Sequence, residues 1–165
     1  MDISEEVIAL AREITEDMGG AATWYCCDVL KTPHELDSTA DLVYTGGGAL
    51  IWIMDIDAWA DVIFRLLQPG GTLFLDEIHP LNYSWDFDAD NYRLIPGPNY
   101  CDGGIVLNHG YPASEVAGNT DIEARPVMCE RIWPLGDVIN ALIRSGLVLK
   151  LFTRKMVGAF AVPQR

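Results

Sequence analysis

The sequence predicts an α/β fold built around a parallel β-sheet. Residues 41–44 form a short apolar run that ends in the glycines at 46–48, and residues 72–75 form a second apolar run. Between these runs, apolar residues recur at spacings of three and four from Ile56 to Leu67, which is the period of a helix with one apolar face. Two strands joined by a crossover helix lie parallel in one sheet, so we expect these two runs to be parallel neighbours.

The elements before this unit follow from the same patterns. A helix is expected after Asp2, because apolar and charged residues alternate at helical spacing up to Met18, and the glycines at 19–20 end it. Residues 22–27 predict a further strand, which stops at Asp28. Asp55 or Asp57 can cap the central helix.

The elements after the central helix begin with a turn. Proline cannot continue a helix and glycine permits positive φ, so residues 68–71 predict a turn before the second strand. Near the C-terminal end, residues 134–146 predict an amphipathic helix. Residues 147–152 and 156–162 predict a closing pair of strands, with a polar break at 153–155.

The central unit resembles part of a known family. Residues 41–44, Trp59 and the sequence at 66–73 resemble the fourth strand, fourth helix and fifth strand of class I methyltransferases that use S-adenosylmethionine. The most specific part is the helix that ends in Leu-x-Pro-Gly-Gly before an apolar strand. The resemblance implies a Rossmann-like sheet, mostly parallel with an antiparallel C-terminal hairpin. It also implies S-adenosylmethionine as the cofactor and methyl transfer to a small-molecule acceptor.

The resemblance leaves the front of the family's fold unmatched. The glycine-rich signature of nucleotide-binding sheets lies about 20 residues before the ribose-binding acid, and only Met1 precedes Asp2 here. We therefore expect residues 1–165 to form one domain that lacks the first strand, its glycine loop and most of the second strand. In the family's strand order, 3-2-1-4-5-7-6, this exposes an edge of the fourth strand. The third strand, another chain such as a second copy in a homodimer, or residues encoded upstream would have to cover that edge.

The resemblance places the cofactor at three strand ends. Asp2, followed by Ile3, takes the place of the acid that binds the ribose hydroxyls. The alternative is that Asp2 only interacts with the N-terminus of a helix. Asp28 and Val29 take the place of the residues that flank adenine. The alternative there is that Asp28 ends a strand while Val29 packs beneath a loop.

The end of the fourth strand completes this expected site. Ligands bind at the carboxyl ends of the strands in open parallel sheets. Tyr44, Thr45 and Gly46 are therefore candidate cofactor contacts. Trp52 is a candidate acceptor contact, since it could stack on a ring or cover the site; alternatively, it could pack in the core as large aromatic residues usually do.

The methyl acceptor is expected beyond the second apolar run. His79 stands beside carboxylates at a strand end, where a group with an unperturbed pKa of about 6.5 can remove a proton near neutral pH. Methyl transfer does not always need such a base, because the sulfonium of the cofactor is already a strong electrophile. Residues 81–131 mix aromatic and turn-forming residues without periodicity, which is typical of a lid or substrate-binding insertion. Tyr83 and Trp85 are its candidate acceptor contacts.

The composition excludes several classes of partner and site. A formal net charge of −13 offers no basic surface to nucleic acid or to an anionic membrane. No apolar run approaches the roughly 20 residues of a membrane span, and the first residues lack the basic start of a signal peptide. The four cysteines contain no C-x-x-C pair and the three histidines show no metal-binding spacing. We expect free thiols, no metal and a cytoplasmic protein.

Two functions remain open on the sequence. The first is an S-adenosylmethionine-dependent methyltransferase with a shortened reading frame. The second is a non-catalytic interaction or oligomerisation module that keeps the sheet but not the cofactor cradle. A nicotinamide-dependent oxidoreductase shares the ribose-binding acid and the sheet, but the turn at 69–71 and the closing hairpin fit that class poorly.

Overall fold

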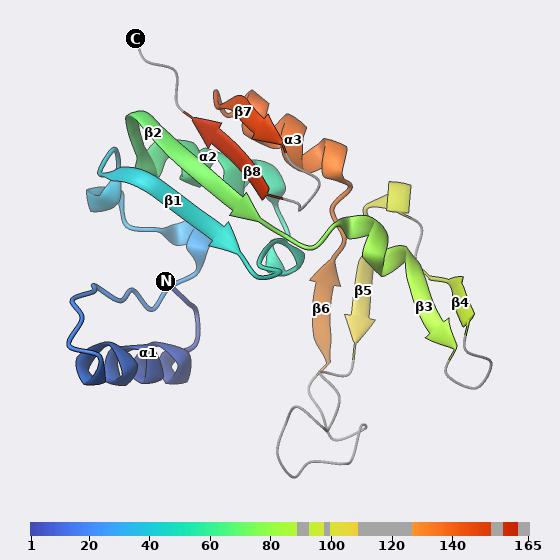
Figure 1. Cartoon of the computed structure of the whole chain (residues 1–165), viewed down its shortest axis with the longest axis horizontal. Helices are drawn as coiled ribbons and strands as arrows, with labels where there is room; N and C mark the ends of the chain where they lie inside the picture. Colours follow the sequence, from blue (N-terminus) through green and yellow to red (C-terminus); the bar gives the residue numbers. More distant parts are fainter. Residues whose placement is uncertain (89–92, 98–99, 109–126, 153–156, 162–165) are drawn as a thin grey trace.

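The computed structural model describes residues 1–88, 93–97, 100–108, 127–152 and 157–161. Within these ranges, a four-stranded sheet forms the body, with two helices behind it in the view of Figure 1. A third helix lies apart near the N-terminus, and two small hairpins extend from the other side (Figure 1). Among the described helices, none combines the length and the apolar character that crossing a membrane requires.

The sheet confirms the predicted parallel pair. Strand β1 (Ala40–Gly46) lies parallel to β2 (Leu67–Asp76), with Leu42 opposite Thr72 and Gly46 opposite Asp76. Strands β7 (Val148–Phe152) and β8 (Val157–Ala161) form the predicted antiparallel pair, and β8 also pairs with β2. The order β1-β2-β8-β7 is the 4-5-7-6 part of the expected sheet. No strand within the described ranges pairs with the outer edge of β1.

Helix α2 (Ile56–Leu66) connects the parallel strands as predicted. Asp55 is its N-cap, because its side chain accepts the N–H of Ala58 at 3.0 Å. The turn expected at residues 68–71 is replaced by an irregularity within β2. Leu67 already pairs with Ala40, and the register then shifts before Leu42 meets Thr72. The two glycines are accommodated as a bulge, and Gly70 has a φ of 87°.

The core lies between one face of the sheet and two helices. Helix α3 (Leu135–Arg144) packs beside α2 on the same face, as Figure 1 shows. The core consists of Leu50, Ile56, Trp59, Ala60, Ile63, Leu67, Leu73, Leu75, Val138, Ala141, Leu142 and Leu147. The opposite face carries Leu42 and Tyr44, which are 60% and 61% exposed. Among the described elements, no helix covers this second face in Figure 1.

The N-terminal segment forms a separate feature. Helix α1 (Glu5–Asp17) begins at Ser4, whose hydroxyl accepts the N–H of Val7. The helix buries Ile8, but four apolar side chains are between 49% and 80% exposed: Val7, Leu10, Ile14 and Met18. The strand predicted at residues 22–27 is wrong. Only an isolated parallel bridge between Asp2 and Cys26 forms there, because no longer strand lies beside it within the described residues.

The segment between β2 and α3 contains two small hairpins rather than the irregular chain that its sequence indicates. Strand β3 (Trp85–Asp88) pairs with β4 (Arg93–Pro96), and β5 (Ile105–Asn108) pairs with β6 (Met128–Arg131). Residues 89–92, 98–99 and 109–126 of the predicted lid lie outside the described residues. The interpretation of residues 81–131 as a substrate lid therefore stays a prediction.

Candidate functional site

A cavity of about 710 Å³ lies between the N-terminal segment and the end of β1. Its walls come from three stretches that are far apart in the sequence: residues 1–3, residues 27–32 and residues 43–53. Helix α2 forms its floor through Trp59, Ile63 and Leu66. All seven residues predicted to bind a cofactor line it: Asp2, Ile3, Asp28, Val29, Tyr44, Thr45 and Gly46. The structure therefore brings together residues that the sequence could only place at separate strand ends.

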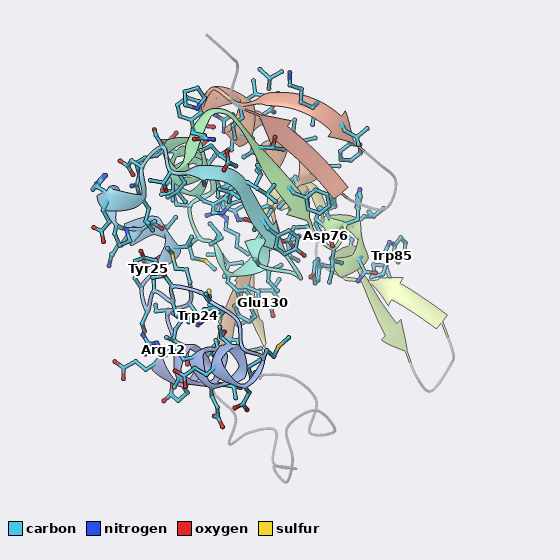
Figure 2. All side chains as sticks on the ribbon, turned by 60° about the vertical axis from the view of Figure 1, so that its left-hand side comes forward. Arg12, Trp24, Tyr25, Asp76, Trp85 and Glu130 are labelled. Carbon is cyan, nitrogen blue, oxygen red and sulfur yellow. The ribbon has the colours of Figure 1, made fainter. Side chains whose placement is uncertain are left out.

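The first wall is fixed by backbone hydrogen bonds around Asp2. The Asp2 N–H donates to the Tyr25 carbonyl at 3.1 Å, and the Cys27 N–H donates to the Asp2 carbonyl at 2.9 Å. Oδ1 of Asp2 accepts the N–H of Ser4 at 2.8 Å, at the start of α1. The Asp2 carboxylate thus interacts with the N-terminus of α1, as one of its two predicted roles requires. Asp2 also lines the cavity, as the other role requires. Figure 2 shows Tyr25 and Trp24 next to α1.

The second wall carries Asp28 and Val29. Asp28 accepts the N–H of Leu30 at 3.0 Å through Oδ1 and caps the short 3-10 helix Val29–Lys31. Arg65 of α2 holds this segment in place. Its Nη2 donates to the Thr32 carbonyl at 2.8 Å and its Nη1 pairs with Asp37. Arg65 is therefore a positioning residue for this wall.

The third wall is the end of β1, where the chain needs glycine. A Cβ on Gly46 would lie 2.9 Å from the main-chain oxygen of Asp76, closer than real Cβ atoms approach. Gly47 and Gly48 have φ values of 73° and 85°, a region that other residues rarely adopt. The Gly47 N–H donates to the same Asp76 oxygen at 3.0 Å. This backbone leaves room for a ligand beside the strand end.

The predicted acceptor contacts divide between this cavity and a smaller one. Trp52 lines the large cavity and is 42% exposed, so it does not pack fully in the core. His79 and Tyr83 line a cavity of about 60 Å³ at the end of β2. Trp85 is among the lining residues of neither cavity; it lies where β3 begins, as Figure 2 shows.

The small cavity is mostly apolar, but its lining includes the half-buried carboxylate of Glu77. Oε1 of Glu77 accepts the N–H groups of Ala49 at 2.9 Å and Leu50 at 3.2 Å. These contacts tie the end of β2 to the short 3-10 helix Leu50–Trp52, whose residues line both cavities. Burial raises the pKa of Glu77 above its ordinary value of 4.5, although the backbone hydrogen bonds act in the opposite direction.

This raised pKa makes the stability of the fold depend on pH. The folded protein keeps the Glu77 proton to a higher pH than the unfolded chain, so the free energy of unfolding falls as pH rises from 4.5 through the folded pKa. Glu77→Gln keeps an acceptor oxygen without the charge and should remove this fall. Urea denaturation between about pH 4 and about pH 8 measures the free energy of unfolding as a function of pH. Glu16→Gln, at an exposed position, is the control and should keep the fall. A Glu77→Gln profile that parallels the wild type would contradict the assignment.

His79 has a defined hydrogen-bonding state in this cavity. Its Nδ1 accepts the N–H of Leu81 at 3.1 Å, and its ring stacks on Tyr100 with the ring centroids 6.2 Å apart. A neutral imidazole that accepts at Nδ1 carries its hydrogen on Nε2. In this arrangement His79 presents a donor, and its candidate role as a base remains a prediction.

Sequence reasoning did not single out Arg131, although this residue lines the small cavity. Its guanidinium carbon lies 3.9 Å from the centroid of the Trp133 ring, and Nη1 donates to the Met54 carbonyl at 3.0 Å. Nε is buried and has no hydrogen-bond partner among the described residues. No local sequence pattern marks Arg131, because the carbonyl to which it donates, that of Met54, lies 77 residues away in the sequence.

Comparisons with known proteins agree with this geometry. A family model described as "Methyltransferase domain" matches residues 1–71. A methyltransferase structure from Mesorhizobium loti is 24% identical, with a TM-score of 0.61; the match covers 96% of this chain and 77% of that one. This chain has the class I methyltransferase fold. The fold class predicted from the sequence is thereby confirmed, and the family model supports the resemblance on which that prediction rests.

Two further class I methyltransferase structures share the fold at lower identity. A putative S-adenosylmethionine-dependent methyltransferase from Listeria monocytogenes has a TM-score of 0.69 at 12% identity, covering 98% of this chain and 78% of that one. One from Methanosarcina mazei has a TM-score of 0.61 at 18% identity, and the match covers 99% of this chain and 81% of that one. None of the curated proteins matches this chain. The family match and the fold imply S-adenosylmethionine as the cofactor.

The residues of the large cavity fit this cofactor. A volume of about 710 Å³ lies in the range of small-molecule sites. Two carboxylates, Asp2 and Asp28, stand where hydroxyl or amino groups of a ligand can donate to them. The backbone at Gly46 leaves the close approach that a bulky ligand needs.

Proposed function

We propose that the protein binds S-adenosylmethionine in the large cavity and transfers its methyl group to a small-molecule acceptor. The observation that carries this proposal is the convergence of seven predicted cofactor contacts, from three distant stretches, on one cavity. When bound, the cofactor supplies an electrophilic methyl group on a sulfonium sulfur. The protein's contribution is then to hold donor and acceptor in line.

Different residues of the cavity bind different parts of the cofactor in this proposal. Asp2 accepts from the ribose hydroxyls, with Ile3 beside it. Asp28 accepts from the exocyclic amine of adenine, and Val29 packs against the ring. Tyr44, Thr45 and Gly46 line the methionine side of the ligand. We also propose the cytoplasm as the place of action.

Titration calorimetry with S-adenosylhomocysteine tests the binding. Asp28→Asn keeps the cap on residues 29–31 but weakens the acceptor that faces adenine. We expect it to raise the Kd about 10-fold, or about 1.4 kcal/mol. Asp17→Asn, on the exposed end of α1, is the matched control and should leave the Kd unchanged. Equal affinity of the Asp28→Asn variant and the wild type would exclude this role for Asp28.

A second function has one observation in its favour. The outer edge of β1 is unpaired within the described residues, and its Leu42 and Tyr44 are exposed, as is the apolar side of α1. Exposed strand edges and apolar patches are typical of interaction surfaces. The alternative is a non-catalytic module that associates through this edge, for example as a homodimer. The absence of any binding of S-adenosylhomocysteine, together with a concentration-dependent mass in solution, would favour the module.

A further inference from the structure

The small cavity at the end of β2 has the shape and lining of a separate binding site. Its volume is about 60 Å³, which at about 10–15 Å³ for each water corresponds to about four to six water molecules. Apolar side chains from four different elements dominate its lining: Leu50, Ile51, Leu75, Val138, Ile139 and Phe152. A ligand that enters must therefore have a small, apolar body.

The polar groups of this cavity are mainly donors. Arg131 is held by its stacking on Trp133 and by the bond from Nη1 to the Met54 carbonyl, so its guanidinium has a fixed orientation. Its buried Nε–H lacks a partner among the described residues, and Arg131 takes part in none of the ion pairs found there. Leaving such a donor unsatisfied costs about 1–3 kcal/mol. A ligand with an acceptor group would recover part of this energy.

The other polar groups fit the same ligand. His79 presents Nε2–H, because its Nδ1 accepts from Leu81. Glu77 is the one carboxylate in the lining, and its Oε1 is occupied by the N–H groups of Ala49 and Leu50. A fixed guanidinium in an apolar setting binds a carboxylate more strongly than a neutral group, since charge-assisted hydrogen bonds are roughly twice as strong.

The small cavity is distinct from the large one. The 3-10 helix Leu50–Trp52 separates the two cavities: Leu50 and Ile51 line the small one, while Trp52 lines the large one. None of the described residues lines both cavities. A ligand in the small cavity would thus be bound independently of a ligand in the large one.

We propose that the small cavity binds a small carboxylate with an apolar body, and that Arg131 holds its carboxylate group. The binding of small carboxylates stands on the cavity itself. It can therefore be tested without the cofactor.

Isovalerate and its neutral isostere isovaleramide are suitable probes, because they share one shape and differ in charge. Ligand-observed NMR titration of the full chain should show isovalerate binding about 10-fold more tightly than isovaleramide. Arg131→Gln should remove this preference, and Arg131→Lys should keep part of it. Arg12→Gln, on exposed α1, should keep all of it.

Three outcomes would overturn the proposal: equal binding of the two probes to the wild type, no binding of either, or an unchanged preference in Arg131→Gln. The comparison of probes on the wild type needs no variant, so it holds even if Arg131→Gln does not fold. Titration with S-adenosylhomocysteine on the same samples separates the two proposals. Loss of cofactor binding with intact isovalerate preference would count against the proposed function and leave the carboxylate site standing.

Discussion

Trp59→Ala is expected to lower the free energy of unfolding by about 3–5 kcal/mol, the usual cost of removing a buried aromatic side chain. Trp59 is 1% exposed and lies in the core between α2 and the sheet, with Ile63, Leu73 and Leu142. Domains of this kind have total stabilities of about 5–15 kcal/mol. This one substitution therefore removes a large part of the total free energy of unfolding. It also opens the floor of the large cavity, which Trp59 lines.

Urea denaturation followed by circular dichroism measures this loss. Trp85→Ala is the matched control, because it removes the same side chain from a position that is 49% exposed. We expect the control to lose less than about 1 kcal/mol. A Trp59→Ala variant as stable as Trp85→Ala would show that the core is not packed between α2 and the sheet as described.

Gly46→Ala is expected to abolish measurable binding of S-adenosylhomocysteine, with a loss of affinity of about 100-fold or more, equal to about 2.7 kcal/mol. The added Cβ would meet the Asp76 main-chain oxygen at 2.9 Å. That oxygen cannot retreat easily, because it accepts the Gly47 N–H and lies in the register that pairs β1 with β2. The end of β1 must shift, and Tyr44 and Thr45 shift with it.

The control for this substitution is Gly104→Ala, where an added Cβ meets nothing within 4 Å. Calorimetric titration of both variants, after circular dichroism has shown that both are folded, gives the comparison. We expect the Gly104→Ala variant to bind as the wild type does. Full affinity in Gly46→Ala would mean that the cofactor does not approach the end of β1, and the proposed site would have to be abandoned.

The parts of the fold that sequence analysis predicted correctly are those specified by local patterns. Helical periodicity between two apolar runs was enough for β1, α2 and β2, and Asp55 proved to be the cap. The strand expected at residues 22–27 was wrong, since a strand also needs a neighbour and only the Asp2 bridge is present. The bulge near Gly70 was missed because it depends on pairing with Ala40.

The candidate site shows the same division. The seven predicted cofactor contacts came from the resemblance, which places each of them at a strand end, and the structure brings these residues to one cavity. Arg65, Glu77 and Arg131 act through partners that are between 28 and 77 residues away in the sequence. Such contacts arise only when the chain folds, so neither spacing nor composition indicates them. The small cavity is therefore not predictable from the sequence.

The attachment of the N-terminal segment has a consequence for the energetics of ligand capture. Two backbone hydrogen bonds on either side of Asp2 join α1 and the acidic residue to the chain at Tyr25 and Cys27. Side chains add three contacts, between Trp24 and Thr15, between Cys26 and the Ile3 carbonyl, and between Thr32 and Met1. Because no described strand of the four-stranded sheet pairs with this unit, it opens more readily than the sheet. Binding a nucleoside would then also immobilise this unit, and the entropy lost would lower the measured affinity below the intrinsic one. A protein in which this unit is already rigid before binding would bind the nucleoside more tightly.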